Sequence, residues 1–301
     1  MIIPNVISYT SIEKLVQIAS EKKQKISSIV LADQAYQMEK TENELLSQME
    51  DDFKVMQDAV IAGQKKNQKS MSSLTGGEGY KMLQYAEHKN GGLCGSFLAG
   101  AISRTLAVAG YNASMGKIVA APTAGSCGVL PGCLVSLYED KELNKKDVIM
   151  SLFTAGAFGM VIAKQACIAG AEGGCQAECG SAAGMAAAAL VELQGGTPQQ
   201  CADACAIAIS NQLGLVCDPV AGLVEIPCIK RNVSSVMIAF SAADMVLSGI
   251  VSEIPVDECI GAMREVGEAI PPSLRETARG GLAATPTGKK LNEKIYGKQP
   301  E

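Results

Sequence analysis

The chain has 301 residues, of which 48% are hydrophobic, 19% charged and 4% aromatic. This composition is typical of a globular protein with a large buried core, and it excludes a disordered chain. With 26 Lys and Arg against 31 Asp and Glu, the formal net charge is -5. We therefore expect no broad basic face and no nucleic-acid partner.

The sequence also argues against export and against a membrane span. The opening stretch MIIPNVISYTSIEK lacks the basic and apolar regions of a secretory signal. The longest uncharged stretch, residues 118–138, contains Pro122 and Pro131, which would break a spanning helix. We expect a cytoplasmic protein without a membrane partner. Its 11 cysteines would stay reduced there, and would serve packing, metal binding or catalysis.

The N-terminal region shows the pattern of charged amphipathic helices. Thr10 with Glu13, and Thr41 with Glu44, fit capping boxes that begin two helices. A polar basic connector, GQKKNQKS, ends this region, and beyond it the sequence is rich in Gly, Ala and Cys. The change of composition divides the chain into two predicted parts: an N-terminal helical extension at residues 1–66 and a larger domain at residues 67–301.

The larger domain is predicted to be helical. Its apolar runs are Ala-rich and lack the alternating pattern of half-buried strands. Thr197, Pro198 and Gln200 form a further helix start. The fold class that follows is mostly α, an all-helical domain with glycine-rich loops, in which short strands are allowed at 117–121 or 224–226. The predicted buried helices span residues 148–164, 181–193, 201–213, 233–251 and 257–268.

Glycine-rich segments between these helices concentrate Gly, Pro, Thr, Ser and Cys. In TGGEG, at residues 75–79, successive backbone N–H groups can point one way and bind an anion. The segment matches neither a Walker loop nor the GxGxxG pattern of dinucleotide sites. A plain tight turn and an anion site both remain open, and a substrate carboxylate is the leading functional interpretation.

Nucleophilic catalysis by a cysteine is poorly supported. Cys127 follows Gly125 and Ser126 in PTAGSCG, where a helix start would lower the pKa of its thiol. A thiol nucleophile also needs a base, and the one histidine of the chain, His88, stands in the charged stretch YAEHKN. We expect His88 on the surface, which argues against a Cys/His dyad and against a Ser/His/Asp triad.

The remaining cysteines allow three interpretations. The CxxxC pairs, Cys175 with Cys179 and Cys201 with Cys205, can form a four-thiolate zinc site, although i,i+4 cysteines on a helix are ordinary core residues. Three cysteines beside Gly or Pro turns can instead hold an iron–sulfur cluster, and three ligands would leave one iron open. Buried packing is the third interpretation.

Five blocks of the sequence together resemble the catalytic alpha chain of the iron–sulfur L-serine dehydratases, in the form that has two subunits. They span about three quarters of the chain, in family order. The blocks are LTGGEGYK (Leu74 to Lys81), MGKIVAAPTAGSCGVLPG (Met115 to Gly132), GAEGGCQAECG (Gly170 to Gly180), LGLVCDPVAGLVEIPCIKRN (Leu213 to Asn232) and RETARGGLAATPTGK (Arg275 to Lys289).

The resemblance implies a cofactor and a partner. In that family three cysteines, in the contexts GCQ, CDPVAG and PCI, ligate a 4Fe-4S cluster with one open iron. The matching residues are Cys175, Cys217 and Cys228, whereas Cys127 and Cys179 receive no role. The two-subunit members place an SSSHT-like motif and a regulatory region on a beta chain, so the resemblance implies a beta-subunit partner.

The implied reaction is the dehydration and deamination of L-serine to pyruvate and ammonia, a step of amino-acid degradation. An open iron can bind the serine hydroxyl and make it a better leaving group. A pyridoxal enzyme is the less favoured route, because Lys164 has no phosphate loop near it in the sequence. The predicted substrate carboxylate site consists of Ser72, Ser73, Thr75, Gly76 and Gly77, with Thr123.

The proton-abstracting base is not identified by the sequence. Glu172 and Glu178 are candidates if burial raises their pKa, and each can equally be structural. Arg275 and Arg279 can clamp a carboxylate or stabilise a helix end. Two other functions stay open: a related iron–sulfur lyase that acts on cysteine or threonine, and a non-catalytic iron–sulfur redox sensor.

Overall fold

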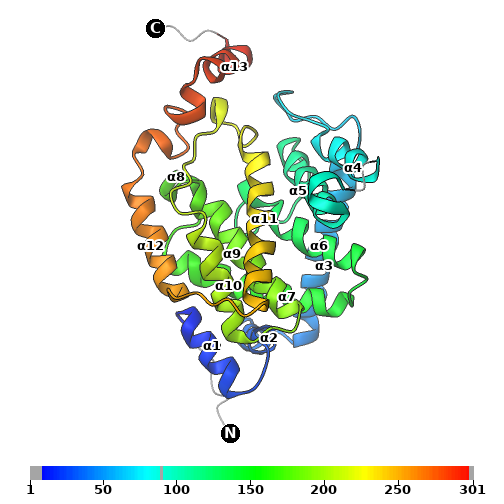
Figure 1. Cartoon of the computed structure of the whole chain (residues 1–301), viewed down its shortest axis with the longest axis vertical. Coiled ribbons are helices and arrows are strands. Elements are labelled where there is room, and N and C mark those ends of the chain that lie inside the picture. The colour runs from blue at the N-terminus through cyan, green and yellow to red at the C-terminus, as the bar shows by residue number, and fades with distance from the viewer. Residues whose placement is uncertain (1–8, 89–90, 298–301) are drawn as a thin grey trace.

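The computed structural model describes residues 9–88 and 91–297, and its regular elements are helices (Figure 1). Within these ranges, strand-like pairing is limited to one isolated parallel bridge, between Cys217 and Arg275. The mostly α fold class is thus confirmed. The α-helices are α1 (Ile12–Glu21), α2 (Ile26–Gln37), α3 (Glu42–Gly63), α4 (Glu78–His88), α5 (Gly95–Ala113), α6 (Val129–Asp140), α7 (Lys145–Gln165), α8 (Gly170–Gly173), α9 (Ser181–Leu193), α10 (Pro198–Ser210), α11 (Cys228–Leu247), α12 (Val256–Ala269) and α13 (Pro286–Tyr296).

Helix α9 lies at the centre of the molecule, between α7, α10 and α11 (Figure 1). Its residues from Ser181 to Glu192 are all buried. Alanine side chains let the neighbouring helices approach closely, and a Cβ at Gly184 would lie 2.8 Å from the Cys205 sulfur. Cys201 and Cys205 therefore pack inside the helical core, as ordinary small residues do.

The N-terminal region contains three helices that pack into the same core. Ile12 of α1 and Phe53 of α3 are completely buried in it. The predicted Thr41–Glu44 capping box is present, with the Glu44 amide donating to the Thr41 hydroxyl at 3.2 Å. The Thr10 prediction is wrong by one residue: α1 begins after Ser11, whose hydroxyl accepts from the Lys14 amide.

Several boundaries differ from the predictions. The Thr197–Gln200 box begins α10 as predicted, but α11 begins at Cys228, five residues before the predicted start. The stretches 117–121 and 224–226, where strands were allowed, form none. Helices α4, α5, α6 and α13 were not predicted, because their Gly-rich and polar sequences weaken the apolar period on which such predictions rest.

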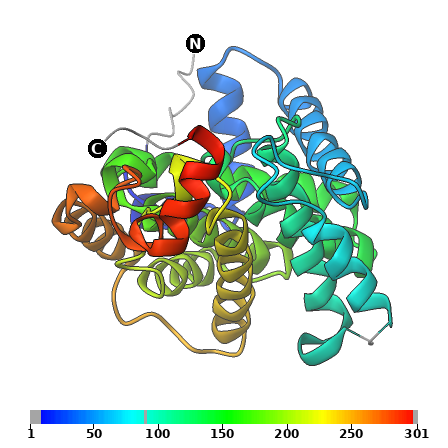
Figure 2. The ribbon, with the colours of Figure 1, turned by 90° about the horizontal axis from the view of Figure 1, so that it is seen from above.

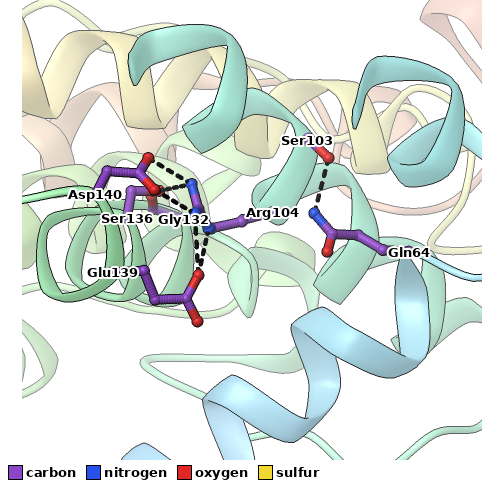
Figure 3. Close-up of polar contacts among 7 residues, drawn as sticks. All are labelled: Gln64, Ser103, Arg104, Gly132, Ser136, Glu139 and Asp140. Atoms are coloured by element: carbon purple, nitrogen blue, oxygen red, sulfur yellow. Dashed lines mark hydrogen bonds and ion pairs between the residues drawn. The ribbon is translucent and has the colours of Figure 1, made fainter. Parts of the chain in front are cut away.

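Polar side chains tie α3, α5 and α6 together (Figure 3). The Arg104 guanidinium of α5 pairs with Glu139 at 2.9 Å and with Asp140 at 2.6 Å, both on α6. The Gln64 amide, directly after α3, donates to the Ser103 hydroxyl at 2.9 Å. These contacts fix the helices from which the loops at residues 64–77 and 114–128 extend.

Two helical stretches, Gly92–Ala113 and Lys145–Gln165, are long and apolar enough to cross a membrane by length and composition alone. Both pack against several other helices of the described chain, and α7 lies along the central helix α9. Buried helices of a large core meet the same criteria of length and composition.

The C-terminal helix covers the segment that precedes α11. Helix α13 lies against the short 3-10 turn at Val220–Gly222 (Figure 2), and the Tyr296 hydroxyl donates to the Ala221 carbonyl at 3.3 Å. Residues 275–296 thus close over the loop that carries Cys217.

The contact between α3 and α5 depends on a missing side chain. A Cβ at Gly63 would lie 1.9 Å from the Ala107 carbonyl oxygen. We expect Gly63→Ala to lower the free energy of unfolding by about 2 kcal/mol, because the helices must separate. Gly261→Ala is the matched control: a Cβ there meets nothing within 4 Å, so this variant should gain about 0.5–1 kcal/mol of helix propensity. Denaturant unfolding of both variants tests the contact, and equal effects would contradict it.

Candidate active site

Three sequence segments meet at the N-terminal end of α11, and Asn232 joins two of them. This side chain is 1% exposed. Its Oδ1 accepts from the Gly128 amide at 2.9 Å, and its Nδ2 donates to the carbonyls of Gly125 at 2.8 Å and Cys228 at 3.0 Å. A buried amide with every group paired fixes the PTAGSCG segment beside Cys228.

The predicted ligand cysteines come from three different local structures. Cys175 directly precedes a π-helical turn, Gln176–Gly180. Cys217 lies in an extended loop, where its amide donates to Leu274 at 2.9 Å, and Cys228 is the first residue of α11. All three are buried. Cys175, Cys179 and Cys217 pack together in a cluster of their own, apart from the main core.

Burial and neighbouring groups shift the pKa of each of these cysteines. The hydrogen bond between the Cys175 and Cys179 thiols, with the sulfurs 3.6 Å apart, lowers the pKa of Cys175; burial opposes this and the Arg231 charge adds to it. Burial first, and then the charge of Cys175, raises the pKa of Cys228 to about 12. Burial and the same charge also raise the pKa of Cys217.

Arg231 places a positive charge between the cysteine segments. Its guanidinium pairs with Asp218 at 2.8 Å and donates to the Val216 carbonyl at 2.8 Å, on both sides of Cys217. Asp218 in turn accepts from the Leu282 amide at 2.7 Å. The guanidinium therefore offsets negative charge on the sulfurs and ties α11 to the C-terminal loop.

Glu178 lies where the PTAGSCG and GAEGG segments meet. The Thr123 hydroxyl donates to its Oε1 at 2.8 Å. A Cβ at Gly125 would lie 2.7 Å from Oε1, and a Cβ at Gly170 would lie 2.8 Å from Oε2 and 3.0 Å from the Cys217 sulfur. Neither glycine has a side chain here, and the Glu178 carboxyl and the Cys217 sulfur both lie beside the Cβ position of Gly170. Burial raises the pKa of Glu178, and the Thr123 hydrogen bond opposes that effect.

The loop at residues 70–77 holds a carboxylate of the protein itself. The hydroxyls of Ser72 and Thr75 donate to Oε2 of Glu225, at 2.8 and 2.9 Å. Glu225 is 5% exposed and lies three residues before Cys228. The loop that carries two of the predicted substrate residues is thus anchored to the segment that carries a predicted ligand.

The other predicted substrate residues lie around this anchor. Ser73 is exposed, whereas Gly77 is buried with its amide donating to the Gln68 side chain at 3.3 Å. A Cβ at Gly76 would lie 2.5 Å from the Gln68 carbonyl oxygen, so only glycine fits there. Thr123, the sixth predicted residue, lies beside Glu178 instead.

The sequence is similar to known proteins over most of its length. A model of the family described as "Serine dehydratase alpha chain" matches residues 21–283. The chain belongs to the serine dehydratase alpha chain family. A protein of Bacillus subtilis named "Probable L-serine dehydratase, alpha chain" is 49% identical over 289 residues, which cover 96% of each chain. The "L-serine dehydratase, alpha chain" of Peptoniphilus asaccharolyticus is 42% identical over 278 residues, 92% of this chain and 95% of that one.

A longer relative matches only in part. The "L-serine dehydratase 2" of Escherichia coli is 44% identical over 182 residues, which are 59% of this chain and 40% of that protein. Relatives of the serine dehydratase alpha chain family therefore include longer chains.

Candidate residues outside the central group have ordinary structural surroundings. Burial raises the pKa of the Cys127 thiol to about 12, so the expected lowering at a helix start is wrong. His88 is exposed, as predicted. The Arg275 guanidinium donates to the Ile270 carbonyl at 2.7 Å and to the Glu268 carbonyl, and so stabilises the end of α12. Arg279 is exposed.

The two glutamates proposed as bases differ in their surroundings. Glu172 is exposed and accepts a hydrogen bond from the Cys167 thiol at 3.1 Å. It lines a cavity of about 300 Å³ on the side of α8 that faces α12, together with Arg264. Glu178 alone combines a raised pKa with a position beside Cys217.

Three polar residues of the site were missed by the sequence reasoning: Glu225, Arg231 and Asn232. All three lie in the block LGLVCDPVAGLVEIPCIKRN, in which only the cysteines were predicted to be site residues. A charged or amide residue directly beside a predicted buried ligand is a usable signal, because its burial requires a polar partner.

Proposed function

We propose that this chain is the catalytic alpha subunit of an L-serine dehydratase, which converts L-serine to pyruvate and ammonia in the cytoplasm. Membership of the serine dehydratase alpha chain family over residues 21–283 carries the proposal. Its alpha chain relatives match it along nearly their whole length. We further propose a beta chain as the partner that completes the enzyme.

The donor set fits the iron–sulfur cluster that the family resemblance implies. Within the described ranges, no three His, Cys, Asp or Glu side chains converge on a single metal ion. The cysteines of a cluster ligate different irons and need not converge in this way. Cys175, Cys217 and Cys228 are buried and come from three segments, and the Arg231 cation offsets thiolate charge. We propose these three residues as the ligands of a 4Fe-4S cluster.

The chemistry divides between cofactor and protein. When bound through three cysteines, the cluster would supply a Lewis-acidic iron with an open position, which assists departure of the substrate hydroxyl. The protein must bind L-serine, orient its α-hydrogen and accept the α-proton. We propose that the loop at residues 72–77 and Thr123 contact L-serine on the side of the ligand cysteines.

Glu178 is the proposed base. Its Oε1 is held by Thr123, while Oε2 accepts no hydrogen bond from the described residues and faces the space left by Gly170. This oxygen takes the α-proton as hydroxide leaves, giving aminoacrylate, and passing the proton to the hydroxide then forms water and restores the carboxylate. Hydrolysis of aminoacrylate then releases pyruvate and ammonia. The glycines at 125 and 170 allow the backbone to approach the carboxyl closely, because a Cβ at either position would clash with it.

An activity assay tests the proposed function. The chain, purified without oxygen together with its beta chain, should release pyruvate and ammonia in equal amounts from L-serine. Release should be faster than the formation of 2-oxobutyrate from threonine or of pyruvate from cysteine. No ammonia from any of the three amino acids would exclude a lyase and favour an iron–sulfur sensor.

The ligand assignment predicts which cysteines hold iron. Cys175→Ala, Cys217→Ala and Cys228→Ala should each lose the cluster, measured as bound iron, acid-labile sulfide and visible absorbance. Cys201→Ala is the matched control: this cysteine is also buried, but it lies in the helical core and should leave the iron content unchanged. Loss of iron from the Cys201 variant, with retention in the other three, would overturn the assignment.

The role of Glu178 predicts a change of pH dependence. Glu178→Gln should lower kcat by about 10²–10⁴-fold without loss of iron. Thr123→Val removes a hydrogen bond that lowers the pKa of Glu178. Since the base must be ionised, the acidic limb of kcat/KM should then move to higher pH. A limb that stays in place, or moves to lower pH, would argue against Glu178 as the base.

A further inference from the structure

Glu225 is a buried carboxylate without a cationic partner. Its side chain is 5% exposed, and none of the four ion pairs among the described residues includes it. The two hydroxyls of Ser72 and Thr75 donate to the same oxygen, Oε2. Removing a carboxylate from water is costly unless charge or hydrogen bonds compensate it, and two neutral donors compensate only in part.

The second oxygen of Glu225 is available. Oε1 accepts no hydrogen bond from the described residues, and it is not fully sealed from solvent. The side chain is therefore held by one oxygen and presents the other at an accessible edge. A ligand with a positively charged donor would satisfy this oxygen and the charge at once.

The position of Glu225 points to the substrate as that ligand. It lies between the loop at residues 70–77 and Cys228, which is three residues later in the chain. Asn232 links Cys228 to Gly125, and Gly125 touches the Glu178 carboxyl. These contacts place Glu225 on the same small region as the proposed base and ligands.

We propose that Glu225 binds the α-ammonium group of the amino-acid substrate, an inference that rests on the proposed function. Each hydroxyl has a single hydrogen, and those of Ser72 and Thr75 are already directed to Glu225. They act through Glu225, as positioning residues. The Ser73 hydroxyl and the Gly76 amide have no partner among the described residues and remain for the substrate carboxylate.

This role makes Glu225 the residue that selects amino acids over hydroxy acids or simple carboxylic acids. Without an ammonium group to neutralise it, the Glu225 carboxylate would repel the carboxylate of a simple carboxylic acid. An uncharged amide at the same place would remove both the attraction for the ammonium and the repulsion of the carboxylate. Selectivity, and not only affinity, should therefore depend on this side chain.

The test uses Glu225→Gln in the complete enzyme with its beta chain, and two inhibitors that differ only in the ammonium group. L-Alanine has the ammonium and carboxylate of serine, and propionate lacks the ammonium. We expect the inhibition constant of L-alanine and the KM of L-serine to rise about 10- to 100-fold. The inhibition constant of propionate should stay unchanged or fall by less than about threefold, and iron content should stay at the wild-type level.

Glu276→Gln is the matched control. The Glu276 amide donates to the Cys217 carbonyl at 2.7 Å, so this variant also removes a carboxylate beside a ligand cysteine. Glu276 does not contact Ser72 or Thr75. The ratio of the two inhibition constants should stay unchanged in this variant.

Other outcomes of the Glu225→Gln measurement would overturn the inference. Equal weakening of both inhibitors would mean that Glu225 only clamps the loop. Tighter binding of propionate by tenfold or more, with L-alanine unchanged, would mean that Glu225 occupies the position of the substrate carboxylate. No change in either constant would remove it from the site. An inactive wild-type complex that still binds L-alanine would count against the proposed function and not against Glu225.

Discussion

Buried thiolates carry negative charge only where positive charge or a metal compensates it, and this constraint explains the polar residues around the site. The Arg231 guanidinium lies beside the cysteine segments, where it is held by Asp218 and the Val216 carbonyl. One cation cannot balance three thiolates. Burial first, and then the charge of Cys175, raises the pKa of the Cys217 and Cys228 thiols. In the proposed function, a cationic iron–sulfur core would compensate the charge of these sulfurs when they are ionised.

Glycine has a related function in the space beside the sulfurs. Any side chain at Gly125 or Gly170 would meet the Glu178 carboxyl, and at Gly170 also the Cys217 sulfur. The close approach of backbone, carboxyl and sulfur therefore depends on both glycines. The central helices use the same device, since a Cβ at Gly184 or Gly63 would meet a neighbouring helix. Small residues thus serve two ends in this protein: close helix packing and close approach of the backbone to the Glu178 carboxyl and the Cys217 sulfur.

The sequence predicted the helical class and most of the site segments, but not how those segments meet. Helices α7, α9 and α12 were found within a few residues because their apolar runs are long. The start of α11 was missed, since Pro227 and Cys228 suggested a turn, and a helix that begins directly after proline gives the same local pattern. Contacts such as Glu225 with Ser72 join residues 153 positions apart, and no local period encodes such a pairing. The cysteine assignment came from a family resemblance, because spacing alone left zinc, packing and a cluster open.

The two glutamates of the site differ in ways that assign them different tasks. Glu178 is only half-buried, has a pKa raised by burial, and keeps one oxygen beside Cys217. Glu225 is almost fully buried and receives two hydroxyl hydrogen bonds on one oxygen. A group that exchanges a proton needs access and a pKa nearer the working pH, whereas a group that binds a cation needs a fixed and permanent charge. Glu178 therefore suits proton transfer and Glu225 suits ammonium binding, and exchanging the two tasks would place each carboxyl in the wrong surroundings.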